Sequence, residues 1–345
     1  MIYNLRDIKH LHVELSSRCN AACPKCPRNF YGYPYNAGYE EHDMSLEEAQ
    51  HIFPPVFLQQ LSRIDINGNF GDVVMSLHTL DIVEYFKRWV PTSTNINIST
   101  NGGARDRVFW TKLAELDIEV FFCLDGLEDT HHLYRQNTLF STVIKNAKTF
   151  IDAGGRAGWK MIMFEHNQHQ VNSCRQLSKD LGFNHFITMD QGRDYGPVYN
   201  SIGELVHIMK PNKWLGSTDF KTHFDVATMP EKQWSPTFRE KKIREWTGEI
   251  KPIACEVKKT KSIYVSSIGD VYPCCYMGFS PKTFKNHDWL GWANTQVAKL
   301  IFENNALEHD LEHCMQWFTK VSESWEKTTN EEGRLSICNQ TCGVS

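Results

Sequence analysis

The sequence reads Leu11-His-Val-Glu-Leu15 and, after three further residues, Cys19-Asn-Ala-Ala-Cys23-Pro-Lys-Cys26. The first five residues alternate apolar and polar side chains, which predicts a β-strand, so the cysteines follow on the loop that leaves it. Three thiolates at this spacing can bind a cluster of four irons and leave the fourth iron without a protein ligand. A zinc knuckle or core thiols are the alternatives, and zinc is disfavoured because no fourth Cys or His follows at zinc-finger spacing.

Strands and helices are predicted to alternate up to about residue 189. Ser45 and Glu48 form a capping box that begins a helix, which Pro54-Pro55 interrupt. Six strands that alternate with helices favour an α/β fold with a parallel sheet curled into a partial (β/α)6 TIM-like barrel, whose sites lie at the carboxyl ends of the strands. The predicted strands are 11–15, 64–66, 96–100, 118–124, 159–164 and 185–189, and the helices are 46–61, 77–89, 107–116, 141–153 and 171–181.

Polar residues follow these strands. A glycine-containing loop with a carboxylate comes after the second strand, where glycines let the backbone approach a ligand and the acid accepts hydrogen bonds from an ammonium. A plain turn is the alternative there, and a loop-stabilising salt bridge is the alternative for the acid and arginine after the fourth strand. His166 is a candidate acid, base or substrate contact, although a lone solvated histidine is the simpler interpretation. The segments are Gly68-Asn-Phe-Gly71-Asp72, Ser99-Thr100-Asn101-Gly102, Cys123-Leu-Asp125-Gly126 with His131 and Arg135, and Glu165-His166-Asn167.

The C-terminal region carries the second cysteine group. Residues 263–265 and 270–272 are predicted to form a hairpin around Gly269. The last hundred residues hold six of the eleven cysteines, at positions 255, 274, 275, 314, 338 and 342. Such a concentration indicates a separate metal-bearing module.

The cysteine triplet and its strand context resemble the radical S-adenosylmethionine (SAM) superfamily. Gly71 and Asp72 are similar to the second glycine and the glutamate of its Gly-Gly-Glu-Pro motif, which holds the amino group of SAM. Ser99, Thr100 and Asn101 are similar to a segment that faces the ribose or methionine part of SAM. The Asp-Gly segment resembles one common in members with C-terminal cluster domains, which implies site roles for Asp125 and Arg135. The chain departs from these patterns at Lys25, Val73 and Cys123, where the family usually has an aromatic residue, proline and serine.

The pattern of Cys255, Gly269 and Cys274 resembles the opening half of a SPASM domain, while the closing half is reduced to Cys338 and Cys342. The region is therefore similar to the abbreviated twitch domain, a small α+β module. The resemblance implies one auxiliary [4Fe-4S] cluster, bound by Cys255, Cys274, Cys338 and Cys342, in addition to the SAM-binding [4Fe-4S] cluster. Structural zinc on these four thiolates is the alternative, because four-cysteine zinc sites have the same ligand count. Cys275 is an alternative to Cys274, and Cys314 has no assigned role. The expected organisation is a barrel over 1–211, a connector or substrate-covering segment over 212–250 and a twitch-like domain over 251–345.

The resemblance implies reductive cleavage of SAM to a 5'-deoxyadenosyl radical that takes a hydrogen atom from the substrate, with an electron donor such as ferredoxin or flavodoxin. Net oxidation or modification of a small molecule is expected, because the first strand begins within about ten residues and leaves no room for a preceding leader-binding domain. A peptide or protein substrate is the alternative. A non-catalytic iron-sulfur carrier or a zinc-binding interaction protein would not need the glycine loop or a three-thiolate site.

Composition sets the remaining bounds. The chain has 345 residues, of which 41% are hydrophobic and 23% are charged, so an ordinary globular protein is expected. No apolar run spans a membrane, no secretory signal is present, and the net charge of -4 disfavours nucleic acid as a partner. A cytoplasmic location is expected, where eleven cysteines indicate metal binding more than disulfides.

Overall fold

The computed structural model describes residues 3–34, 40–189, 196–210, 250–279 and 296–344. The predicted connector, 212–250, lies outside these ranges except for its last residue. The boundaries predicted at 211/212 and 250/251 therefore remain predictions.

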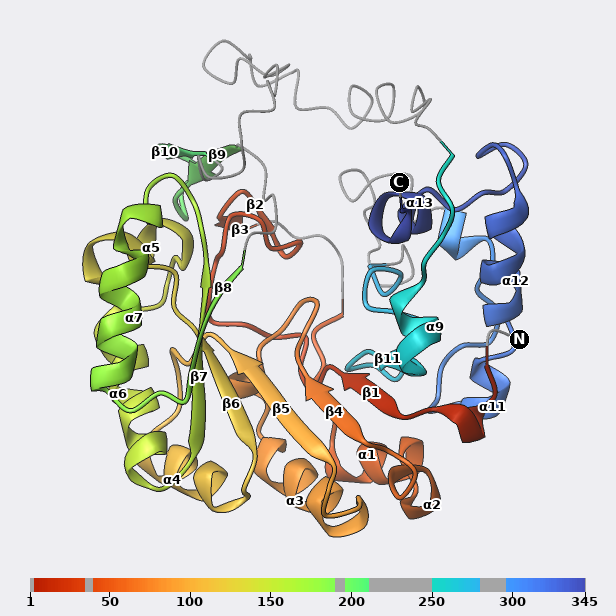
Figure 1. Cartoon of the computed structure of the whole chain (residues 1–345), viewed down its shortest axis with the longest axis horizontal. Helices are drawn as coiled ribbons and strands as arrows, with labels where there is room; N and C mark the ends of the chain where they lie inside the picture. The colour runs from red at the N-terminus through yellow and green to blue at the C-terminus, as the bar shows by residue number, and fades with distance from the viewer. Residues whose placement is uncertain (1–2, 35–39, 190–195, 211–249, 280–295, 345) are drawn as a thin grey trace.

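An eight-stranded sheet forms the centre of the molecule, in the order β12-β11-β1-β4-β5-β6-β7-β8 (Figure 1). The six strands predicted from the sequence are the contiguous block from β1 to β8, and every neighbouring pair within that block is parallel. The α/β barrel prediction is confirmed in its strands and in their order. Their bounds are β1 His10–Val13, β4 Arg63–Ile66, β5 Asn95–Thr100, β6 Glu119–Cys123, β7 Arg156–Ile162 and β8 His185–Met189.

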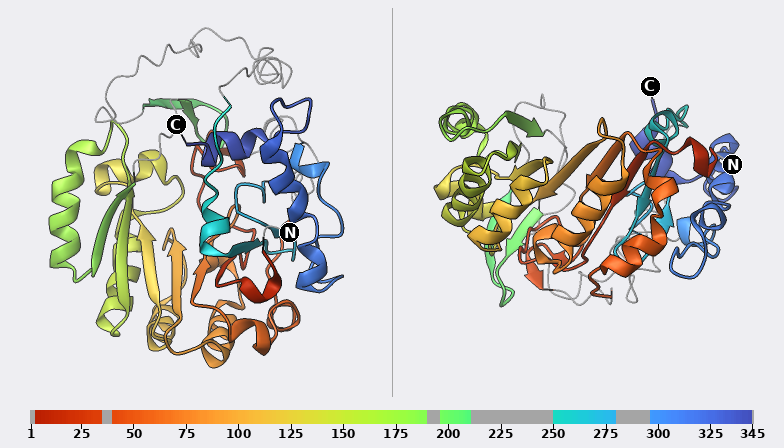
Figure 2. Two further views of the ribbon diagram at one scale, coloured as in Figure 1. Left: turned by 45° about the vertical axis from the view of Figure 1, so that its right-hand side comes forward. Right: turned by 90° about the horizontal axis from the view of Figure 1, so that it is seen from below.

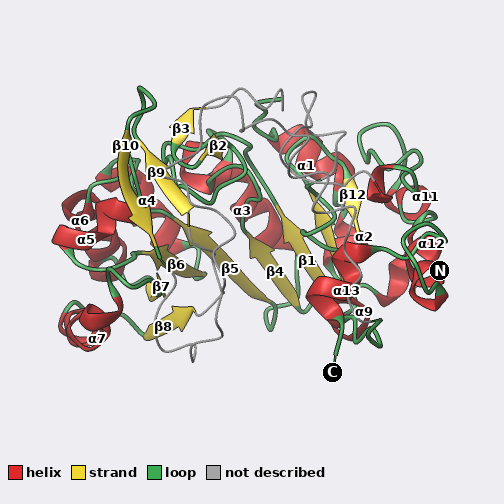
Figure 3. Ribbon diagram, turned by 90° about the horizontal axis from the view of Figure 1, so that it is seen from above, coloured by secondary structure: helices red, strands yellow, loops and turns green. Residues whose placement is uncertain are grey.

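Helices cover the outer face of this sheet (Figure 3). Alternate strand residues such as Ile64, Ile98 and Phe122 are buried beneath them, because successive side chains of a strand point to opposite faces. The predicted helices are present, and their bounds are α1 Leu46–Ile52, α2 Pro55–Leu58, α3 Thr79–Trp89, α4 Arg107–Glu115, α6 Phe140–Asp152 and α7 Val171–Asp180.

Two local predictions are confirmed, and one helix was missed. The helix expected over 46–61 is interrupted at Pro54-Pro55 as predicted, because these prolines cannot continue α1 and the second proline opens α2 instead. The capping box is present, with Ser45 accepting a hydrogen bond from the Glu48 amide at 3.1 Å. A short helix, α5 Glu128–Tyr134, follows the Asp-Gly segment and was not predicted.

The C-terminal hairpin extends the barrel sheet. Its strands, β11 Ser262–Val265 and β12 Val271–Tyr272, pair antiparallel around Gly269, which has a φ of +84°. The hairpin prediction is confirmed. β11 also pairs in parallel with β1, from His10 opposite Ser262 to Val13 opposite Val265. The two cysteine-bearing regions are therefore joined by one hydrogen-bonded sheet.

The remaining described elements surround the open end of the barrel and the hairpin. Figure 2 shows the C-terminal segment, in cyan and blue, lying against the first strand, in red. Two small antiparallel ribbons lie near the cysteine loop (Figure 1). These elements are β2 Asn29–Phe30, β3 Tyr33–Pro34, β9 Gly196–Tyr199, β10 Leu205–Met209, α9 Glu256–Thr260, α11 Leu311–Cys314, α12 Phe318–Glu323 and α13 Ser336–Cys342, with single 3₁₀ turns at Leu5–Asp7, Val73–Met75, Gln168–Gln170 and Ser324–Glu326. None of the helices in the described ranges has the length and apolar character needed to cross a bilayer.

A buried carboxylate fixes the junction of β1, the glycine loop and β11. Glu14, with 1% of its surface exposed, accepts hydrogen bonds from the backbone amides of Phe70 and Gly71, each at 2.8 Å. Its other oxygen accepts a hydrogen bond from the Tyr264 hydroxyl at 2.9 Å. Burial raises the pKa of Glu14, and these three hydrogen bonds act against that rise. One side chain thus connects three segments that are distant in sequence.

Replacing Glu14 should therefore destabilise the whole junction. We expect Glu14→Ala to lower the free energy of unfolding by about 2–4 kcal/mol, because two amides and a hydroxyl lose their acceptor in a buried place. Glu14→Gln keeps one oxygen acceptor and should cost less. Urea denaturation of the full chain, followed by circular dichroism, measures both. The control is Glu115→Gln at an exposed position, and equal stability of Glu14→Ala and this control would contradict the assignment.

Candidate metal centre

The first three cysteines lie on the loop after β1, at the carboxyl edge of the barrel sheet. Cys23 is buried, and Cys19 and Cys26 are partly buried against the same apolar cluster, which includes Tyr134 and Phe164. N–H donors point at the sulfurs. The Ala21 amide lies 3.4 Å from Cys19 Sγ, the Asn101 side chain lies 3.5 Å from it, and Arg135 lies 3.7 Å from Cys23 Sγ. Such donors stabilise a thiolate, which is the form that binds metal.

The glycine loop packs against the chain itself. A Cβ on Gly71 would lie 1.7 Å from the Ser16 carbonyl oxygen, and one on Gly68 would lie 2.6 Å from Glu14 Oε1. Glycine is therefore required at both positions, because any side chain there would collide with residues that follow β1. The prediction that these glycines admit a ligand is untested, and the contacts give them a packing role that sequence reasoning missed.

Asp72 joins the glycine loop to the end of β5. Its carboxylate is buried and accepts hydrogen bonds from the Thr100 hydroxyl and the Asn101 amide, both at 2.6 Å, and from the Val74 amide at 3.1 Å. Burial raises the pKa of Asp72, and the hydrogen bonds oppose the rise. The structure therefore brings together three residues predicted for one site, Asp72, Thr100 and Asn101, and extends them through the Asn101 side chain to Cys19.

Ser99 points to the other face of β5, toward the barrel interior. Its hydroxyl accepts a hydrogen bond from Lys160 of β7 at 2.8 Å, and the Lys160 ammonium lies 4.1 Å from the centroid of the Phe121 ring. Cys123 is opposite Lys160 in the β6–β7 register and is partly buried. The sequence did not single out Lys160. Its alternation with buried apolar residues in β7 is the signal that would have placed it inside the barrel.

Asp125 and Arg135 form a buried ion pair. The Arg135 Nε donates to Asp125 Oδ2 at 2.6 Å, and the Ile162 amide donates to Asp125 Oδ1 at 2.5 Å. Burial by itself would lower the pKa of Arg135, but the nearby Asp125 carboxylate raises it by more, so the pKa of Arg135 is raised overall. The salt-bridge interpretation of these residues is confirmed. The pair also reaches the metal centre, because the same guanidinium lies beside Cys23.

His166 lies at this edge without a hydrogen bond to its Nε2 among the described residues. Its ring stacks on Phe164 with centroids 5.2 Å apart, and it meets His207 of β10 edge-on at 6.2 Å. Burial, followed by the neighbouring His207, lowers the pKa of His166 to about 4. The imidazole is therefore neutral at physiological pH and half-buried, and the choice between a site role and a solvated side chain stays a prediction.

The second cysteine set lines one cavity of about 380 Å³. A hydrogen bond between the Cys255 and Cys342 thiols lowers the pKa of Cys342 and raises the pKa of Cys255. Burial raises the pKa of Cys274, and the nearby Cys275, Cys338 and Cys342 thiols add to that rise. The structure thus gathers the four predicted C-terminal ligands, together with Cys275, around one space.

The two unassigned cysteines differ in position. Cys275 lines the cavity beside Cys274, but its backbone carbonyl accepts a hydrogen bond from the Asn69 side chain at 2.7 Å. Cys314 is fully buried on α11, with its sulfur 3.9 Å from the His309 carbonyl oxygen, and is not among the residues that line the cavity. Through the hydrogen bond from Asn69 to the Cys275 carbonyl, the glycine loop contacts the C-terminal cysteine region directly.

The structure of this chain is similar to several solved protein structures. No protein-family model matches the chain, and no curated protein sequence does. The structure resembles anSMEcpe with bound AdoMet (TM-score 0.54, 15% identity, covering 97% of this chain and 86% of that one). It also resembles SuiB of Streptococcus suis bound to the precursor peptide SuiA (TM-score 0.50, 14% identity, covering 89% of this chain and 64% of SuiB). A third structure, anSMEcpe with AdoMet and the Cp18Cys peptide, matches with a TM-score of 0.50 and 16% identity, over 96% of this chain and 89% of that one.

The buried His131 gives the site a pH-dependent stability. It is fully buried, accepts the Asp125 amide hydrogen at Nδ1 and donates from Nε2 to Thr138. Burial lowers its pKa from the ordinary 6.5 to about 4. The folded protein therefore binds fewer protons than the unfolded chain in this window, so the stabilisation is present above pH 6.5 and is lost as the pH falls toward 4.

We expect His131→Asn, which keeps an acceptor for the Asp125 amide, to remove this pH dependence. The parent should lose about 2 kcal/mol more than the variant between about pH 7.5 and about pH 5. Urea denaturation at the two pH values measures the difference. Equal losses in parent and variant would show that His131 does not titrate in this way.

Proposed function

We propose that this chain, which has the fold of the radical SAM enzymes, is itself a radical SAM enzyme. Cys19, Cys23 and Cys26 would hold an open-site [4Fe-4S] cluster at the carboxyl edge of the barrel. When SAM is bound to such a cluster, reductive cleavage supplies a 5'-deoxyadenosyl radical that abstracts a hydrogen atom from the substrate. The observation that carries the proposal is the three-thiolate loop with N–H donors directed at Cys19 and Cys23.

The residues around the loop have positioning roles in this proposal. Asn101 contacts both Cys19 and Asp72, so it fixes the cysteine loop relative to the end of β5. Arg135 and Asp125 place a paired cation beside Cys23. The glycine loop and the segment 99–101 would face SAM, as the resemblance of their sequences to family motifs implies. The Asp72 carboxylate already accepts three hydrogen bonds from the protein. An ammonium of SAM would have to bind to its remaining lone pairs.

The inner face of the barrel would hold the substrate. Ser99, Phe121 and Lys160 offer a hydroxyl, an aromatic face and an ammonium on one surface next to the candidate SAM residues. In the structural neighbours anSMEcpe and SuiB, the bound partners include the Cp18Cys and SuiA peptides. This likeness favours a peptide substrate over the small molecule expected from the sequence. Both remain proposals about the same site.

The C-terminal cysteines would hold the auxiliary [4Fe-4S] cluster. Cys255, Cys274, Cys338 and Cys342 line one cavity and include a hydrogen-bonded thiol pair, so the donor set and the space fit such a group. The position of this cavity beside the glycine loop would suit a group that accepts one electron from the substrate radical, which would leave the substrate oxidised. A reductant of the ferredoxin or flavodoxin type would supply the electron for SAM cleavage.

The proposal is tested by iron content and SAM cleavage together. We expect about eight irons per chain in the anaerobically reconstituted protein, and about four in the variant with Cys19, Cys23 and Cys26 all changed to Ala. With dithionite and SAM, the parent should form 5'-deoxyadenosine and the triple variant should form none. Liquid chromatography and an iron assay measure both quantities.

The matched control is Cys174→Ala, which removes a buried thiol on α7 and should leave iron and cleavage unchanged. Cleavage that persists in the triple variant would overturn the role of the triplet. A parent that binds no iron after reconstitution would overturn the enzymatic proposal as a whole.

The choice between two adjacent cysteines can be tested separately. Cys274 completes the spacing from Cys255 and Gly269 that resembles the opening half of the SPASM pattern, whereas Cys275 lies one residue beyond it. We therefore expect Cys274→Ala to lose about half of the bound iron and Cys275→Ala to keep nearly all of it. Iron analysis and electron paramagnetic resonance of the reduced proteins distinguish the two. The reverse pattern would assign Cys275 as the ligand.

A further inference from the structure

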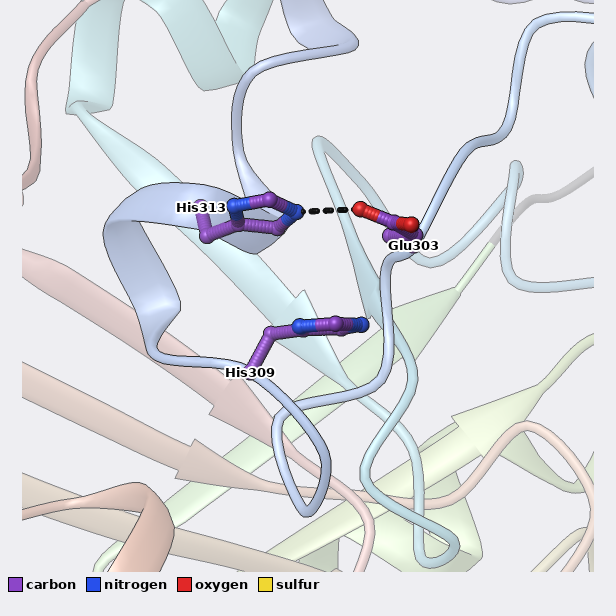
Figure 4. A group of neighbouring side chains, drawn as sticks. All are labelled: Glu303, His309 and His313. Atoms are coloured by element: carbon purple, nitrogen blue, oxygen red, sulfur yellow. Dashed lines mark hydrogen bonds and ion pairs between the residues drawn. The ribbon is translucent and has the colours of Figure 1, made fainter.

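We propose that Glu303, His309 and His313 form a zinc-binding site that is separate from both cysteine sets. Their ligand atoms all lie within 4.8 Å of one another (Figure 4). Two imidazoles and one carboxylate are ligands that Zn²⁺ accepts, with a water molecule in the remaining position. The three side chains are partly exposed or exposed, so an ion can enter from solvent.

The two histidines are brought together by local sequence. His309 and His313 are four residues apart: His309 precedes Asp310, the N-cap of α11, and His313 lies in the single turn of that helix. Asp310 caps this helix by accepting a hydrogen bond from the His313 amide at 2.8 Å, which fixes the turn. The rings stack with centroids 4.6 Å apart and planes 23° apart. Figure 4 shows the rings one above the other, with a nitrogen of each on the side of Glu303.

Glu303 reaches the histidines from a different segment. Its Oε2 lies 2.7 Å from His313 Nε2, and its backbone has a φ of +42°. The next residue, Asn304, is fully buried and holds the backbone of β12 through two hydrogen bonds with Val271. This anchoring keeps the Glu303 backbone in place beside α11.

The adjustment needed for zinc is small. Tetrahedral bonds of about 2.0–2.1 Å require ligand atoms roughly 3.4 Å apart. His313 Nε2 and Glu303 Oε2, which lie 2.7 Å apart, would separate slightly, and the His309 nitrogen, which lies within 4.8 Å of both ligand atoms, would move toward them. The bound ion would connect the turn at Glu303 to α11, since both pack beside the hairpin β11–β12. It would therefore brace the C-terminal region independently of iron.

Zinc binding to iron-loaded full-length protein tests the proposal. After treatment with a chelator, the parent should bind one zinc equivalent more than the double variant His309→Gln/His313→Gln, measured anaerobically by competition with a fluorescent zinc indicator. Each single variant, including Glu303→Gln, should bind that zinc at least tenfold more weakly. His51→Gln, which alters an exposed histidine on α1 that lines the same groove as His309, is the matched control and should bind like the parent.

The ligands of the bound zinc provide the second measurement. X-ray absorption should show a nitrogen and oxygen shell at about 2.0–2.1 Å with imidazole scattering, and no sulfur shell at about 2.3 Å. A sulfur shell, or equal zinc content in parent and double variant, would place the zinc on cysteines and overturn the site. Iron content and circular dichroism confirm that each variant is folded. A parent that binds no zinc would leave the three residues as a hydrogen-bonded surface group and would likewise overturn the proposal.

Discussion

The Glu14 carboxylate is the constraint on which the arrangement of this protein depends. A buried charge is tolerated only where hydrogen-bond donors replace water, and here the donors come from the glycine loop and from Tyr264 of β11. Meeting that need fixes the end of β1 against two segments that are distant in sequence. The cysteine loop leaves β1 directly after this point, so its starting position is set by the same carboxylate.

A second set of contacts carries this order from the strand ends to the cysteines. Asp72 connects the glycine loop to Thr100 and Asn101, and Asn101 continues to Cys19. On the opposite side, Asp125 holds Arg135 beside Cys23. Because these polar groups are buried and pair with one another, the residues next to the sulfurs have little freedom to move. Preorganisation of this kind is what a reactive metal centre requires.

The sequence predicted the parts of the structure that depend on local patterns. Alternation and helical periodicity located the six parallel strands and their helices, and the cysteine spacing located both candidate centres. The pairing of β11 with β1 was not predictable in this way, because a register between residues 10 and 262 leaves no local signal. The internal partners of Asp72 were also missed, since a motif indicates which residue types recur but not which neighbours they contact. The pair of histidines at 309 and 313 can be recognised from its spacing in the sequence. Glu303 cannot, because only the tertiary structure places it beside them.

The contacts between the two cysteine regions argue that they act as one unit. β11 is hydrogen-bonded along β1, Asn69 of the glycine loop binds the Cys275 carbonyl, and Phe70 meets Phe279 edge-on with centroids 5.4 Å apart. The loop that lies between the two regions therefore contacts both. Glu14 binds the loop at the amides of Phe70 and Gly71, and the residue before them, Asn69, binds the C-terminal region, so adjacent residues of one loop hold the two regions together. The same loop continues to Asp72, which connects through Asn101 to Cys19, so the C-terminal region packs against the segment that supports the first cysteine.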